Sequence, residues 1–148
     1  MIVEFCIVRR DRGCLLIASP GTLDVAEIRL IRIPLKIAQP DVARAGGITE
    51  IRRIAALTSA HGVRLAPHAW GSGVLFAASI HVAMAAPNCH ILEVSQGWMP
   101  MMWELFNEPF DIRPDGMVHA PDVPGLGFTL RPDALERFRY ANGPEYMF

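Results

Sequence analysis

The amino-acid sequence predicts an α/β protein built on a parallel sheet. Between residues 35 and 94, apolar segments of strand length alternate with longer segments of helix length in the order βαβαβ. A polar residue, Asp41 or His68, stands just after each of the first two strand segments, one strand–helix–strand step apart. Parallel strands end at the same edge of a sheet, so this pattern places both residues at one edge.

Length, composition and charge limit the class of protein. The chain has 148 residues, 51% of them hydrophobic, and a formal net charge of −1, which is typical of one domain without a nucleic-acid surface. No apolar run is long enough to span a membrane. The short apolar run 2–8 contains Glu4 and is followed by Arg9 and Arg10, unlike a secretory signal. The cysteines have no paired spacing and are interpreted as reduced thiols, so we expect a cytoplasmic protein.

Residues 1–34 form an atypical N-terminal segment, distinct from the part that follows, residues 35–148. Two short apolar runs, 2–8 and 14–18, allow a hairpin. Ser19, Pro20 and Gly21 then interrupt the pattern.

The first strand–helix unit of the second part covers residues 35–62. A strand over 35–39 ends at Asp41, and Gly47 precedes a helix over 48–61 with one apolar face. Gly62 is placed to end this helix.

The next unit repeats this order. A strand over 63–66 leads to Ser72, a good N-cap for a helix that is apolar almost all round and stops before Pro87. A third strand is predicted over 90–94.

The remaining residues, 96–148, are less regular. We expect a short helix over 98–106, a turn at Asp115 and Gly116, a strand over 117–120 and a final helix over 133–140.

Three polar residues follow or end the three predicted strands: Asp41, His68 and Glu93. A carboxylate beside an imidazole orients the ring and raises its basicity, so Asp41 and His68 have the composition of a general base. The alternatives are structural: an Asp after a strand also serves as a turn or helix cap. His81, inside the apolar helix, is interpreted as a core or interface residue, and Trp70 either lines a pocket or packs.

Several motifs together carry a family resemblance. They are Gln39-Pro40-Asp41, Gly46-Gly47-Ile48-Thr49-Glu50, Pro67-His68, Glu93 and Pro124-Gly125-Leu126-Gly127. In this order and spacing, over about residues 36–140, the sequence resembles the mandelate racemase/muconate lactonizing enzyme family of the enolase superfamily. The resemblance implies a partial enolase-type (β/α) barrel, namely the last three βα units and a C-terminal return segment.

The resemblance also implies a chemistry. Members of the family use Mg²⁺ and remove the proton α to a substrate carboxylate, as racemases or acid-sugar dehydratases. By this resemblance Asp41 corresponds to the Asp that ends the sixth barrel strand and His68 to the base that ends the seventh. Glu93 corresponds to the eighth-strand acid that hydrogen-bonds the enolate oxygen. The expected substrate is a carboxylate or sugar acid, whose identity the sequence leaves open.

The sequence also departs from the family pattern. The family's metal ligands end the third, fourth and fifth strands and its second acid/base lysine lies on the second, and none of these is recognisable here. Where the last ligand is expected, the chain has Ala18-Ser19-Pro20. We therefore assign no residue to Mg²⁺ or another cofactor, and expect a truncated barrel that is inactive alone. The alternative is a non-catalytic oligomerising or interaction module, and open barrel edges predict self-association in either case.

Overall fold

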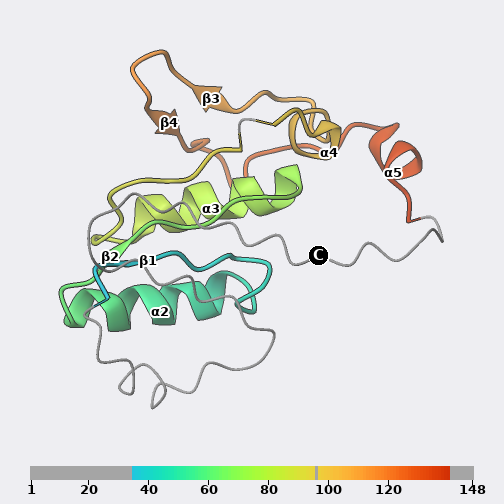
Figure 1. The fold of residues 1–148 in the computed structure, drawn as a ribbon. Coiled ribbons are helices and arrows are strands. Elements are labelled where there is room, and N and C mark those ends of the chain that lie inside the picture. The colour runs from blue at the N-terminus through green and yellow to red at the C-terminus, as the bar shows by residue number, and fades with distance from the viewer. Residues whose placement is uncertain (1–34, 96, 141–148) are drawn as a thin grey trace.

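The computed structural model describes residues 35–95 and 97–140, so the predictions for residues 1–34 lie outside the described residues (Figure 1). The elements in chain order are β1 (Ile37–Ala38), α2 (Ile48–Ala60), β2 (Arg64–Leu65), α3 (Gly73–Ala85), α4 (Pro100–Trp103), β3 (Asp111–Ile112), β4 (Val118–His119) and α5 (Ala134–Arg137).

The first two strands pair in parallel, as predicted. Ile37 is opposite Arg64 and Ala38 is opposite Leu65. Both strands are shorter than the predicted segments, but the parallel register continues beyond them to an isolated bridge between Asp41 and His68. The backbone ladder itself therefore brings the two predicted site residues together.

The prediction of a regular strand over residues 90–94 is wrong, but the predicted parallel direction of this segment relative to β2 is confirmed. The segment from Asn88 to Glu93 runs parallel to β2. The Leu65 N–H donates to the Asn88 carbonyl at 2.9 Å, the His90 N–H to the Leu65 carbonyl at 3.1 Å and the Glu93 N–H to the Pro67 carbonyl at 3.3 Å. The Cys89 thiol donates to the Ile91 carbonyl at 3.5 Å within this segment. Among the described residues, the segment forms a single parallel bridge, between Leu65 and Cys89, and no continuous ladder.

Helix α2 follows the predicted pattern closely. Its buried residues, Ile51, Ala55 and Thr58, lie one turn apart on the inner side. Gly62 has a φ of 66°, a left-handed conformation that favours glycine, and its N–H donates to the Ser59 carbonyl at 3.0 Å. The helix therefore ends where its sequence indicated.

Helix α3 is the buried helix of the molecule. The Ser72 hydroxyl accepts the Leu75 N–H at 3.3 Å, which confirms the predicted N-cap. His81 is half-buried, and its Nε2 lies 3.0 Å from the Leu126 carbonyl, so it joins α3 to the return segment. This confirms the interpretation of His81 as a packing residue.

The two long helices pack on one face of the sheet. Ala38 of β1 and Leu65 of β2 share a cluster with Ala55 of α2 and Ala86 at the end of α3. In Figure 1 the axes of α2 and α3 run alongside β1 and β2, and the β3–β4 hairpin lies beyond α3, on the side away from α2. This arrangement of parallel strands with helices on one face is that of a barrel wall.

The C-terminal part packs against α3 through aromatic side chains. Phe110 contacts its neighbours edge-on or tilted, with ring centroids 4.7 Å from Phe76 and 4.8 Å from Phe128. Helix α4 starts at Pro100, a favoured first position, and is shorter than the predicted 98–106. Helix α5 is likewise shorter than the predicted 133–140. Strand β3 was not predicted, because both its residues are exposed and give no apolar alternation.

Within residues 35–95 and 97–140, the structure contains no helix with the length and apolar character needed to cross a bilayer.

Candidate active site

Asp41 lies three residues after the end of β1, and its carboxylate organises the turn that follows. Oδ1 accepts the Ala43 N–H at 2.8 Å and the Arg44 N–H at 3.0 Å. The other oxygen, Oδ2, lies 2.8 Å from His68 Nδ1. The two predictions for Asp41, a turn cap and a partner of His68, are therefore both correct, and a different oxygen serves each.

His68 is held by its backbone as well as its ring. Its N–H donates to the Pro40 carbonyl at 3.1 Å, which fixes the residue beside the end of β1. Because an ionised Asp41 Oδ2 can only accept, the neutral imidazole carries its proton on Nδ1. The lone pair of the ring is then on Nε2, the atom that faces away from Asp41.

Glu93 lies on the other side of the ring. Its Oε1 is 3.9 Å from His68 Nε2, too far for a direct hydrogen bond but close enough for charge attraction. The side chains of His68 and Glu93 are 20% and 23% exposed, so the site opens to solvent at this point. The structure thus brings all three predicted residues to one edge of the sheet.

Hydrogen bonds and neighbouring charges shift the pKa values of His68 and Asp41. The hydrogen bond with Asp41 raises the pKa of His68 above 6.5 despite the opposing effect of burial, and the charge of Glu93 raises it further. Burial alone would raise the pKa of Asp41. The hydrogen bonds from His68 and from the Arg44 and Ala43 N–H groups outweigh it, so the pKa lies below 3.8. An ionised carboxylate beside a more basic imidazole is the arrangement that a general base requires.

These residues do not fit a magnesium site. Both oxygens of Asp41 are already hydrogen-bonded, and Mg²⁺ prefers six oxygen ligands in octahedral geometry. Among the described residues, no three His, Cys, Asp or Glu side chains are grouped closely enough to hold a metal ion. Of the three site residues, only Glu93 has no direct hydrogen bond with another of them.

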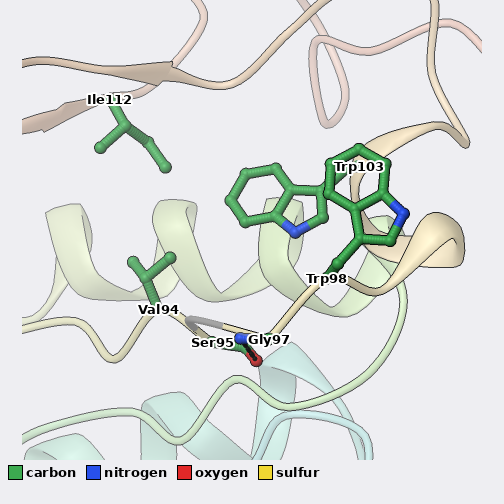
Figure 2. A pocket seen from close by; sticks show the side chains of 6 residues that line it. All are labelled: Val94, Ser95, Gly97, Trp98, Trp103 and Ile112. Carbon is green, nitrogen blue, oxygen red and sulfur yellow. Dashed lines mark hydrogen bonds between the residues drawn. The ribbon is translucent and has the colours of Figure 1, made fainter.

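A cavity of about 340 Å³ begins one residue beyond Glu93 (Figure 2). It is lined by Val94, Ser95, Gly97, Trp98, Trp103 and Ile112. Val94 packs against the cluster that contains Phe76 and Ile80 of α3, so the cavity lies toward the helix side. None of the three acid–base residues lines it, and we do not treat it as the reaction centre.

Two further residues lie close to the dyad in sequence. Trp70, which was predicted either to line a pocket or to pack, is 41% exposed in the loop after His68, and it does not line the cavity. Arg44 was not predicted as a site residue, yet its charge lowers the pKa of His68. The signal that was available is its position, three residues after Asp41 in the turn that the carboxylate holds.

Fold and site together define an acid–base pair at the carboxyl edge of parallel βα units. Residues 29–134 match the family model described as "Enolase C-terminal domain-like". The chain belongs to this family, as its motifs indicated, and its fold is that of a part of the enolase-superfamily barrel.

Relatives and solved structures agree with this assignment. The chain is 39% identical over 111 residues to a D-galactarolactone cycloisomerase of Agrobacterium fabrum, covering 70% of this chain and 29% of that protein. It is 42% identical over 108 residues to a D-galactonate dehydratase family member of Streptomyces bingchenggensis, covering 72% and 25%. A crystal structure of an enolase-superfamily member from Polaromonas sp. JS666 matches with a TM-score of 0.71 and 31% identity, covering 83% and 32%. The chain thus spans less than a third of the length of these proteins.

Proposed function

We propose that this chain supplies the proton-transfer wall of an enolase-type barrel that acts on a sugar acid. The observation that carries the proposal is the 2.8 Å contact between Asp41 Oδ2 and His68 Nδ1, which leaves Nε2 as the proton acceptor. The named relatives, a cycloisomerase and a dehydratase, support an acid-sugar substrate.

In the proposed reaction, His68 Nε2 takes the proton on the carbon next to the substrate carboxylate. Asp41 stays ionised and stabilises the imidazolium that forms, and its hydrogen bond keeps the ring in one orientation. Glu93, on the far side of Nε2, attracts the protonated ring.

We further propose that the chain is truncated relative to the whole enzyme and does not turn over substrate alone. The α-proton of a carboxylate is weakly acidic, because its removal places a second negative charge on the molecule. Enolase-superfamily enzymes neutralise that charge with Mg²⁺, the kind of electrostatic stabilisation that dominates such barriers. The described residues of this chain do not fit that ion, so they supply a base without the group that stabilises its product.

Deuterium exchange tests this proposal directly. The purified chain is incubated in D₂O with Mg²⁺ and one compound at a time: galactarate, galactonate or mandelate. The α-proton signal of that compound is followed by NMR. We expect no incorporation above a protein-free control. Incorporation that disappears in His68→Ala would support the base but contradict the inactivity of the chain alone. Incorporation that persists in His68→Ala would contradict the role of His68.

A further inference from the structure

The segment from Asn88 to Glu93 is held against β2 by backbone hydrogen bonds that are concentrated at its start. The Leu65 N–H donates to the Asn88 carbonyl at 2.9 Å, and the Leu65 carbonyl accepts the His90 N–H at 3.1 Å. In a regular parallel ladder, the next bond would run from the N–H of residue 67 to the His90 carbonyl, but Pro67 has no N–H. The Pro67 carbonyl instead accepts the Glu93 N–H at 3.3 Å. The position of Glu93 therefore depends on how firmly the start of the segment is fixed.

The side chain of Asn88 fixes that start. Its Nδ2 donates to the Val63 carbonyl at 2.9 Å and to the Thr58 Oγ1 at 3.0 Å. Because the Val63 carbonyl can only accept, the amide must present Nδ2 to it and not Oδ1. In a regular ladder this carbonyl would accept a backbone N–H of the neighbouring segment, so the Asn88 amide replaces that backbone bond. One side chain thus anchors the segment both to the residue before β2 and to the last turn of α2.

The acceptor on α2 is itself fixed. Thr58 is buried, and its hydroxyl donates to the Ile54 carbonyl at 2.8 Å, which leaves the oxygen free to accept from Asn88. The Asn88 Oδ1 is buried without a hydrogen-bond partner among the described residues. A buried acceptor without a partner lowers stability, so the gain from this amide lies in the two bonds that its Nδ2 donates.

We propose that Asn88 is a positioning residue for the acid–base site: its side-chain amide fixes the register of residues 88–93 along β2 and so holds the Glu93 carboxylate beside the His68 ring. Glu93 Oε1 lies 3.9 Å from His68 Nε2, and one residue of extended chain spans about 3.3 Å. A slip of the segment by one residue would therefore remove this contact. The inference rests on the proposed function for the role of His68 as a base, but the position of Glu93 is measurable without any turnover.

NMR titration of the His68 ring reports that position. The charge of Glu93 raises the pKa of His68, so Glu93→Gln should lower this pKa. Asn88→Ala removes both anchoring bonds and should lower the pKa of His68 by a similar amount. In a double variant with Glu93→Gln, Asn88→Ala should cause no further fall, because the charge that it positions is already absent. The other charged groups that act on His68, Asp41 and Arg44, lie in the turn after β1 and are unchanged in these variants.

Two further variants separate positioning from loss of stability. Thr58→Val removes one of the two acceptors of the Asn88 amide, and it should lower the pKa of His68 less than Asn88→Ala does. Gly127→Ala strains the return loop, away from residues 88–93, and should destabilise the chain without moving the His68 titration curve. Circular dichroism confirms that each variant keeps its helices. If Asn88→Ala does not fold, Thr58→Val takes its place in the comparison.

The outcomes separate the inference from the proposed function. An unchanged pKa of His68 in Asn88→Ala or in Glu93→Gln would overturn the inference. So would an equal fall in Gly127→Ala, or a fall in Asn88→Ala that persists in the double variant. Proton abstraction is reported by the deuterium exchange experiment instead. Incorporation that persists in His68→Ala would contradict the proposed function and leave the positioning role of Asn88 in place.

Discussion

The pKa values of Asp41 and His68 shift in opposite directions, and these shifts determine how pH affects the stability of the protein. The pKa of His68 is raised, so its stabilising contribution is complete below about 6.5 and is lost as pH rises through the higher folded value. The pKa of Asp41 is lowered, so its contribution is present above 3.8 and is lost as pH falls through the lower folded value. The pair stabilises the fold most between these limits.

Asp41→Asn should therefore destabilise the protein most in mildly acidic solution. We expect a loss of about 1–3 kcal/mol near pH 5, because the protonated ring then faces a neutral amide instead of a carboxylate. The loss should shrink as pH rises above the folded pKa of His68. Urea unfolding at several pH values measures this. Asp115→Asn, in an exposed turn between β3 and β4, is the control. An identical pH profile for both variants would contradict the coupling.

Arg44 provides a second test at the scale of one residue. Its charge lowers the pKa of His68, so Arg44→Gln should raise that pKa above its value in the unchanged chain. NMR titration of the His68 ring protons measures the change. Arg52→Gln removes an equal charge from α2 and should leave the His68 titration curve in place. If the two variants shift His68 equally, the local effect of Arg44 is refuted.

At the scale of elements, the sequence predicted α2 and α3 well because their limits depend on local signals. Gly62 ends α2 with a left-handed conformation, and Ser72 caps α3 with its hydroxyl. The segment 90–94 reads as a strand from its apolar residues, but its pairing depends on neighbours distant in sequence. Among the described residues, β2 is the neighbour to which this segment bonds, and a local pattern cannot show that pairing.

The acid–base site was predictable for a related reason. Asp41 and His68 stand at equivalent points of two consecutive βα units, and parallel pairing brings such points together. The cavity beside Trp103 was not predictable in this way. It arises from packing between β3 and α4, which spacing in the sequence does not determine.

The return loop offers a prediction with an internal control. Gly125 and Gly127 both have a φ of 78°, but a Cβ on Gly127 would lie 2.3 Å from the Pro121 Cβ, whereas Gly125 has open space. Gly125→Ala should cost about 1 kcal/mol for the strained backbone. Gly127→Ala should cost about 1–3 kcal/mol more, because the proline ring must move.

Urea unfolding of both variants measures the difference. The His81 ring is a second probe of the change in this loop, because its hydrogen bond with the Leu126 carbonyl joins the loop to α3. Equal losses of stability in the two alanine variants would show that the close approach to Pro121 does not matter.

At the scale of the whole molecule, stability should be uneven across the sheet. β2 is the central element, with neighbours on both sides, while the segment 88–93 has a described neighbour on one side only. Hydrogen exchange should therefore be at least about tenfold slower at the Leu65 and Ala66 amides than at Ile91.

Exchange measured by NMR on the purified chain tests this difference. Equal exchange at all three amides in the chain alone would contradict the view of β2 as the stable centre.

The backbone bridge between Asp41 and His68 has a consequence for inheritance. The Pro40 carbonyl, the turn at Ala43 and the ring of His68 lie within one βαβ unit, and the hydrogen bonds that join them to Asp41 and His68 are made inside that unit. The contact between Asp41 and His68 is therefore encoded by a single continuous stretch of chain, and it is inherited as one unit.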